Sequence, residues 1–268
     1  MEPERHPLNR SFEWSKTRGP FRRVSEARAR AYDADGYFVL ENVFDPDLIA
    51  RVTAEIDPVE ERVERFLRKQ KDETLFIARA GAITFSPHLV AKSELLREFC
   101  RGPVFQDLAH DLLGPDVRLY WDQAVYKKPE VPREFPWHQD NGYTYLEPQR
   151  YLTCWVALTD ATLESGCPWV VPGLHRRGTL NHWMTDLGWQ CLKSDAGAVS
   201  APVGAGGIVV FSSLTPHRTG PNLTDGVRKA YIVQFAPDGA RIVKPGGTTE
   251  ACDAPDRQFP ILRGGRPV

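Results

Sequence analysis

The chain has 268 residues, 41% of them hydrophobic, which is enough for one large domain or two small ones with an apolar core. Lys plus Arg number 34 against 35 for Asp plus Glu, leaving a formal charge of −1. This balance argues against a nucleic-acid partner and against a polybasic membrane patch, because both need a basic excess.

Residues 1–23 are polar and basic without periodicity, and we expect a loose arm there. The composition of residues 24–32 favours a helix that Gly36 ends, and a short strand is expected at 37–40. Asp45 and Pro46 suit the start of a helix that Pro58 should interrupt, so a second helix is expected beyond it. A further helix is predicted over residues 93–113, ended by Gly114.

After residue 114 the hydrophobic period changes from about 3.6 to 2, which is typical of strands. Leu119, Trp121, Gln123 and Val125 should share one face of the first strand. Further strands are predicted at 151–159, 169–171, 208–212 and 228–235, separated by turn residues. Residues 176–203 are too long for a hairpin, so we interpret them as a lid-like insertion.

This order of elements predicts a mainly β fold with α-helical N-terminal support. We expect a single domain over 1–268, with the support at 24–114 and a jelly-roll core at 115–236, which can bury a metal and a ligand at one open end. Residues 237–268 are rich in Gly, Pro and Arg and are expected to form a tail.

The five cysteines form no Cys-x-x-Cys pair and are odd in number, which predicts no disulfide framework and favours a reducing compartment. The charged N-terminus lacks the apolar segment of a signal peptide, and no run approaches the roughly 20 apolar residues of a membrane helix. We therefore expect a cytoplasmic protein that does not enter a membrane.

A candidate metal site lies in the stretch Phe135-Pro-Trp-His-Gln-Asp-Asn-Gly-Tyr-Thr-Tyr145. If this stretch is extended, His138 and Asp140 point to the same face, so both side chains can reach one metal ion. His217, at the end of a later strand, is the candidate third ligand. Two histidines and one carboxylate with open positions are typical of non-haem Fe(II) oxygenases. A zinc hydrolase with the same three ligands, or a non-catalytic jelly-roll binding protein, remains an alternative.

Arg228 begins a strand whose two faces are both mostly apolar. A buried arginine needs a partner, and a carboxylate bound through two parallel hydrogen bonds is the natural one. A dicarboxylate cosubstrate would supply that carboxylate, and the alternative is an internal salt bridge with an Asp or Glu.

Together these motifs resemble the phytanoyl-CoA dioxygenase family of Fe(II)/2-oxoglutarate oxygenases. The resemblance rests on Asp35-Gly-Tyr-Phe-Val-Leu40, on Trp137-His-Gln-Asp140, and on Trp155-Val-Ala-Leu-Thr-Asp-Ala161 with Gly166-Cys-Pro-Trp-Val-Val-Pro-Gly173. His217 and Arg228 complete it, and the matches span roughly residues 24–236.

The resemblance implies a double-stranded β-helix (jelly-roll, cupin-like) and a reaction that uses Fe(II), 2-oxoglutarate and O2 and releases succinate and CO2. It implies iron on His138, Asp140 and His217. It also implies a cosubstrate pocket formed by Arg228 at the distal carboxylate, helped by Thr219 and lined by Gln123 and Trp155. Related halogenases leave the carboxylate position to a small residue, so Asp140 favours hydroxylation or a related oxidation.

The substrate is expected to be a small molecule, either a metabolite or a natural-product intermediate. Trp137, Tyr143 and Tyr145 flank the candidate ligands and are predicted to line the substrate side. Trp183 and Trp189 are predicted to approach it from the lid-like insertion.

Overall fold

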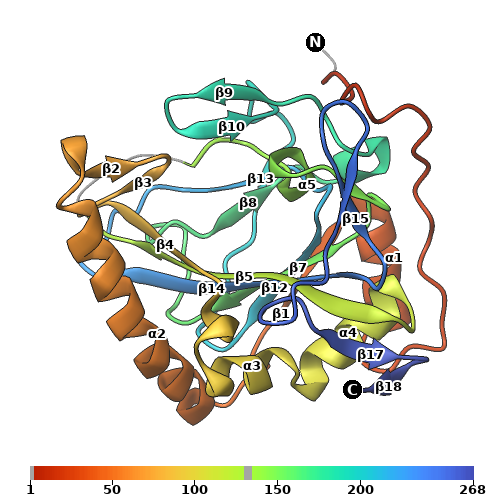
Figure 1. Ribbon diagram of the computed structural model, residues 1–268, viewed down its shortest axis with the longest axis horizontal. Coiled ribbons are helices and arrows are strands. Elements are labelled where there is room, and N and C mark those ends of the chain that lie inside the picture. Colours follow the sequence, from red (N-terminus) through yellow and green to blue (C-terminus); the bar gives the residue numbers. More distant parts are fainter. Residues whose placement is uncertain (1–2, 130–134) are drawn as a thin grey trace.

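The computed structural model describes residues 3–129 and 135–268 (Figure 1). Its helices are α1 (Glu26–Asp35), α2 (Pro46–Leu67), α3 (Glu94–Cys100), α4 (Pro103–Leu113) and α5 (Asp140–Tyr143), with 3-10 turns η1 (Lys71–Glu73), η2 (Leu89–Ala91) and η3 (Leu174–Arg177). Its strands are β1 (Tyr37–Leu40), β2 (Thr74–Leu75), β3 (Ala78–Arg79), β4 (Ile83–Pro87), β5 (Val117–Lys127), β6 (Leu146–Glu147), β7 (Leu152–Ala157), β8 (Pro168–Val170), β9 (Trp183–Thr185), β10 (Gly188–Gln190), β11 (Val199–Ser200), β12 (Ile208–Ser212), β13 (His217–Thr219), β14 (Arg228–Pro237), β15 (Arg241–Val243), β16 (Thr249–Ala251), β17 (Pro260–Arg263) and β18 (Arg266–Pro267).

One large antiparallel sheet forms the frame of the molecule, in the order β1-β12-β7-β14-β5-β4-β3-β2. A smaller sheet, β11-β8-β13, is extended by a backbone bridge between His138 and His217. Residues of both sheets pack together in one apolar cluster that includes Trp155 and Val209 from the large sheet, Trp169 from the small sheet, and Cys167 next to β8. The fold is therefore a mainly β jelly roll with helices outside it.

Helices α2, α3 and α4 cover the outer face of the large sheet (Figure 1). On β14, Tyr231, Val233 and Phe235 belong to the core beneath these helices, whereas Ala230 and Ile232 face the space between the sheets. This alternation follows from the period of two along a strand and confirms the prediction for residues 228–235.

The predicted alternation along β5 holds only in part. Trp121, Gln123 and Val125 face the interior of the jelly roll, but Leu119 belongs to the core under the helices. The pairing with β14 shifts between Gln234 and Phe235, so one residue of β5 is left over at a bulge. A bulge inserts one extra residue into a strand and thereby reverses the direction of the side chains beyond it.

Helix α2 is one continuous helix, and the prediction that Pro58 separates two helices is wrong. Asp45 caps its start through the backbone N–H of Asp47, as expected. Proline removes one hydrogen bond from a helix interior. The apolar face with Val52 and Ile56, both fully buried, holds the helix on the sheet despite that loss.

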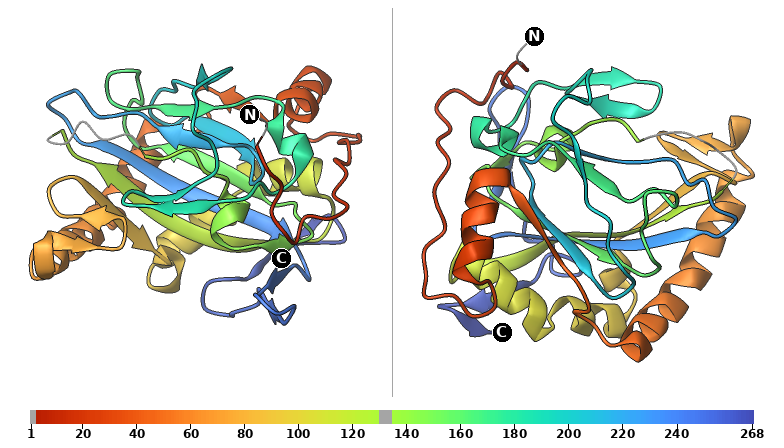
Figure 2. Two further views of the ribbon diagram at one scale, coloured as in Figure 1. Left: turned by 90° about the horizontal axis from the view of Figure 1, so that it is seen from above. Right: turned by 180° about the vertical axis from the view of Figure 1, so that it is seen from behind.

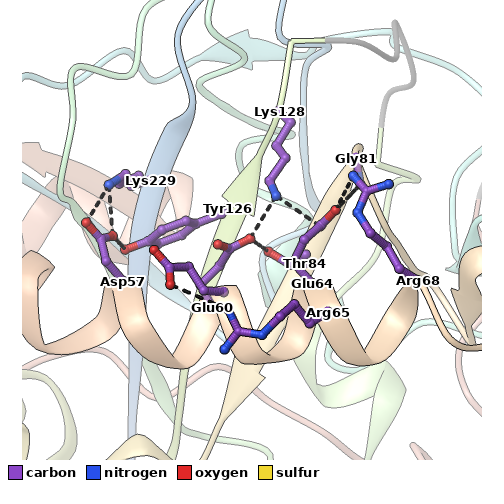
Figure 3. Close-up of polar contacts among 11 residues, drawn as sticks. Asp57, Glu60, Glu64, Arg65, Arg68, Gly81, Thr84, Tyr126, Lys128 and Lys229 are labelled. Atoms are coloured by element: carbon purple, nitrogen blue, oxygen red, sulfur yellow. Dashed lines mark hydrogen bonds and ion pairs between the residues drawn. The ribbon is translucent and has the colours of Figure 1, made fainter.

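The polar face of α2 is attached to the sheet as well (Figure 3). The Asp57 carboxylate accepts a hydrogen bond from the Tyr126 hydroxyl at 2.6 Å and lies 2.8 Å from the Lys229 ammonium. One turn further on, Lys128 lies 3.2 Å from Glu60 and 2.9 Å from Glu64. These contacts join α2 to the ends of β5 and β14 that lie next to the cavity described below.

The helix predicted over 93–113 is two helices, α3 and α4. Gly102 has an extended backbone (φ −57°, ψ 152°) and Pro103 begins α4. Proline disfavours helical geometry in the residue before it, so the chain turns at this position. Gly114 ends α4 as predicted.

The described part of the N-terminal arm contains no helix or strand, but it is anchored along the outside of the molecule (Figure 2). The Asn9 side chain donates to the carbonyl groups of Arg177 and Thr179, and Trp14 donates to Asp33. The arm is therefore fixed to the body rather than loose. The C-terminal tail also adds structure, because β17 pairs with β5.

The insertion at 176–203 contains the β9–β10 hairpin and β11. All five cysteines are free and buried. Among the described residues, no helix is long and apolar enough to span a bilayer.

Candidate metal centre

The side chains of His138, Asp140 and His217 converge between the two sheets. His138 and His217 pair through their backbones, with N–H to O=C distances of 3.0 and 2.8 Å. Gln139 has an extended backbone (φ −107°, ψ 141°), so the residues on either side of it point the same way, and Asp140 then begins α5. The sequence prediction that these three residues come together is thus matched by the geometry.

The candidate ligand atoms are close enough to bind one ion. Nε2 of His217 lies 3.6 Å and Nε2 of His138 lies 3.9 Å from Oδ1 of Asp140. One ligand atom from each residue lies within 4.8 Å of the other two. An ion that contacts all three atoms from one side keeps its opposite positions free for other ligands.

Backbone carbonyl groups orient both imidazole rings. Nδ1 of His138 lies 2.9 Å from the carbonyl oxygen of Pro136, and Nδ1 of His217 lies 3.0 Å from that of Thr215. A proton on each Nδ1 leaves the Nε2 lone pair for a metal. Burial lowers the pKa of His138 to about 3 and that of His217 to about 4, so both rings are neutral at pH 7.

The carboxylate of Asp140 is oriented from the large sheet. The Thr153 hydroxyl on β7 donates to Oδ2 of Asp140 and accepts a hydrogen bond from the Gln234 amide on β14 at 3.2 Å. Burial raises the pKa of Asp140, which means that its charged form lacks water around it. A cation at the three ligand atoms would provide the missing stabilisation.

Gln139, the residue between the two ligands, is a positioning residue that the sequence analysis did not identify. Its fully buried amide donates to the carbonyl groups of Gly178 and Leu214 and accepts from the N–H of Leu180 at 2.6 Å. Its own backbone N–H donates to the imidazole of His182 at 3.0 Å. No local pattern indicates this role, because every partner is distant in the chain.

Arg228 lies in the same interior space with its guanidinium unpaired. The residue is 1% exposed, and none of its three side-chain nitrogens has a hydrogen-bond partner among the described residues. It lies 5.2 Å from the ring centre of Trp155, and desolvation lowers its pKa to about 10. Among residues 3–129 and 135–268, no Asp or Glu forms the internal salt bridge that was the alternative from sequence. A buried guanidinium without a partner fits a site that receives an anion.

A cavity of about 660 Å³ contains these groups. The three candidate ligands, Arg228, Thr219, Gln123 and Trp155 all line it. Of the aromatic residues predicted for the substrate side, Tyr143 lines it, and so does Trp189 from the insertion. The β2–β3 hairpin contributes further lining that the sequence did not indicate, because two-residue strands carry no detectable pattern.

Trp137, Tyr145 and Trp183 do not line the cavity, and the expectation for them is corrected. The indole N–H of Trp137 donates to Asp195 at 2.7 Å, which directs the ring away from the ligands. Tyr145 stacks on the ring of His6 in the N-terminal arm. Neighbouring strand residues point to opposite faces, so proximity in sequence to a ligand does not place a side chain in the cavity.

Comparisons with known proteins agree with this geometry. The sequence model of the phytanoyl-CoA dioxygenase (PhyH) family matches residues 32–230. The chain is 26% identical to the mouse phytanoyl-CoA dioxygenase domain-containing protein 1, across 89% of this chain and 98% of that protein. It is 27% identical to the ectoine dioxygenase of Bordetella parapertussis, across 79% and 75%.

Among solved structures, the fold resembles SnoK, a non-heme alpha ketoglutarate dependent carbocyclase from nogalamycin biosynthesis. The TM-score is 0.68 at 24% identity, with 82% of this chain and 87% of that chain covered. The match to the family model extends over most of the chain and includes all three candidate ligands and Arg228. The chain belongs to the phytanoyl-CoA dioxygenase family of Fe(II)- and 2-oxoglutarate-dependent oxygenases.

Proposed function

We propose that this oxygenase hydroxylates a small-molecule metabolite or natural-product intermediate, with Fe(II) held by His138, Asp140 and His217. The observation that carries the proposal is the buried guanidinium of Arg228, which has no hydrogen-bond partner in the described part of the chain and shares a cavity with three convergent ligand atoms. Three convergent metal ligands alone would also suit other enzyme classes, such as a zinc hydrolase. A metal site that shares a cavity with a buried cation suits a dicarboxylate cosubstrate bound between them.

In this proposal the two imidazoles provide neutral nitrogen donors whose rings are fixed by backbone carbonyl groups. Asp140 provides the charged oxygen donor, oriented by Thr153. When bound, Fe(II) with 2-oxoglutarate and O2 supplies the oxidising chemistry that converts 2-oxoglutarate to succinate and CO2. The carboxylate at position 140 occupies the place that halogenases leave open, which favours hydroxylation over halogenation.

Arg228 would bind the distal carboxylate of 2-oxoglutarate through two parallel hydrogen bonds. Thr219 lines the same cavity and has the hydroxyl group for a further hydrogen bond, while Gln123 and Trp155 form its walls. Arg228 is 1% exposed, so this ionic contact is stronger than it would be at the surface.

The test is succinate release from 2-oxoglutarate by purified protein, with and without Fe(II). We expect slow, Fe(II)-dependent release without substrate, and its loss in His138→Ala and in Asp140→Ala. His110→Ala is the matched control, because this histidine lies on α4 and does not line the cavity. Full activity in either ligand variant would refute the ligand assignment. Stoichiometric zinc together with no response to 2-oxoglutarate would instead support the zinc hydrolase.

We also propose that the protein works in the cytoplasm. Five free and buried thiols support a reducing compartment. Thiol titration of freshly isolated, denatured protein should count five, and an oxidised pair would oppose the proposal.

A further inference from the structure

Two hairpins meet over the cavity. The β2–β3 hairpin lies at one side of the large sheet and the β9–β10 hairpin lies above it (Figure 1). A Cβ on Gly188 of β10 would lie 2.9 Å from a methyl group of Ile77 and 3.0 Å from the Tyr143 hydroxyl. The hairpins therefore touch at Gly188 and Ile77, next to Tyr143, and both Ile77 and Tyr143 line the cavity.

The tip of the β2–β3 hairpin carries large apolar side chains that are exposed. Leu75 is 53% and Phe76 is 60% exposed, yet both line the cavity. Phe76 also has a left-handed backbone (φ 54°), which is unfavourable for a bulky residue. Exposed apolar groups and backbone strain at one position are typical of a surface that closes on a ligand. Both side chains would become buried against a bound apolar molecule.

The charged groups that line the described part of the cavity are those proposed to bind the metal and the cosubstrate. Apart from the three candidate ligands, Arg228 is the one ionisable group among the described lining residues that is charged at pH 7. Both the ligands and Arg228 are assigned to the metal and 2-oxoglutarate. Among the described lining residues, an ionised substrate would find no counter-ion to replace the hydration that it loses.

The remaining walls are mostly apolar, and many of their residues are aromatic, including Phe85, Trp121, Phe135 and Trp189. Flat aromatic side chains stack well against rings. The polar groups left for a substrate are neutral, and the Tyr143 hydroxyl, next to the β10 backbone, is one of them. Such walls select shape and apolar surface rather than charge.

We propose that the substrate is a neutral, predominantly apolar, ring-bearing molecule that enters between the two hairpins and is covered by Leu75, Phe76 and Trp189. The inference rests on the proposed function, since it assigns the charged end of the cavity to Fe(II) and 2-oxoglutarate. A substrate of this kind differs in charge from a zwitterion and from a phosphate-bearing thioester.

The experiment uses two probes with the same rings and different charge, 2-naphthylmethanol and 2-naphthoate. Binding of Fe(II) and of 2-oxoglutarate to the full chain is first measured by calorimetry without oxygen. Each probe is then titrated into the loaded protein, with tryptophan fluorescence as the readout. We expect the neutral probe to bind at least tenfold more tightly than the carboxylate.

Phe76→Asp should weaken binding of 2-naphthylmethanol at least fivefold, because it places a charge where apolar contact is expected. Aspartate tolerates the left-handed backbone, so the hairpin should keep its shape. Phe66→Asp is the matched control, since Phe66 is 49% exposed on α2 and does not line the cavity. We expect this control to bind the probe as the parent does.

Equal or tighter binding of 2-naphthoate, no binding of either probe, or equal effects of the two phenylalanine variants would each overturn the inference. With Fe(II) and 2-oxoglutarate bound, these outcomes leave the proposed function intact. Failure of Fe(II) and 2-oxoglutarate to bind would overturn the proposed function, and this inference with it.

Discussion

Replacing Arg228 with methionine should have opposite effects on stability and on cosubstrate binding. Without 2-oxoglutarate the guanidinium is buried and unpaired among the described residues, and desolvation lowers its pKa from 12.5 to about 10. That difference corresponds to a cost of about 3 kcal/mol for keeping the charge inside the protein. Methionine keeps most of the apolar stem and removes the charge. We therefore expect the free energy of unfolding to rise by about 1–3 kcal/mol.

The same substitution removes both hydrogen bonds proposed for the distal carboxylate. At about 1.5 kcal/mol for each bond to a charged group, 2-oxoglutarate binding should weaken by about 3 kcal/mol. This corresponds to a roughly 150-fold higher Kd. Calorimetric titration of 2-oxoglutarate into Fe(II)-loaded protein without oxygen measures the affinity, and urea denaturation of the unloaded protein measures the stability.

Arg118→Met is the matched control. Arg118 is also buried, but it is paired with Asp238 and with two backbone carbonyl groups. Its removal should lower stability and leave 2-oxoglutarate affinity unchanged. If Arg228→Met lowered stability as this control does and left the affinity intact, Arg228 would be structural and the cosubstrate assignment would be refuted.

Thr153→Val should lower Fe(II) affinity about tenfold by releasing Asp140, as measured by calorimetry, and unchanged affinity would refute the orienting role. Asp57→Ala should lower the free energy of unfolding, measured by urea denaturation, by about 1–2 kcal/mol, because Tyr126 and Lys229 on the sheet lose their acceptor. Glu61→Ala breaks an exposed ion pair and should change the free energy of unfolding by less than about 0.5 kcal/mol. Burial raises the pKa of Asp122 from 3.8 to about 6, so between these pH values the folded state keeps a proton that the unfolded state has released. The free energy of unfolding therefore falls as the pH rises through this range. Relative to the parent, Asp122→Asn should therefore gain about 3 kcal/mol between pH 4 and pH 7, and parallel pH profiles would contradict this.

The features that the sequence could predict are those encoded locally. The capping residue Asp45, the strand at 37–40 and the alternation on β14 each depend on neighbouring residues and appear as expected. The convergence of His138 and Asp140 with His217 followed from the chemistry of the residue types together with the family resemblance.

The features that the sequence could not predict depend on distant contacts. Pro58 stays within a helix because the surrounding residues of α2 are packed and paired with the sheet. The bulge in β5 appears only in its pairing with β14, and it turns Leu119 to the opposite face. Likewise, the hydrogen-bond partners of the Gln139 side chain come from segments far along the chain. A role for the exposed Phe76 can be inferred only because the structure shows that it lines the cavity.

The backbone bridge between His138 and His217 has a consequence for how the protein acquires its metal. These residues are 79 positions apart (217 − 138 = 79), so their pairing closes a long segment of chain that includes β7, β8 and β12. Contacts of such long sequence separation form late in folding. The nascent chain therefore cannot use the ion as a template, and any ion bound there stabilises the finished fold by mass action. Unfolding should therefore release the ion, and added Fe(II) should raise the unfolding midpoint of the folded, ion-free protein.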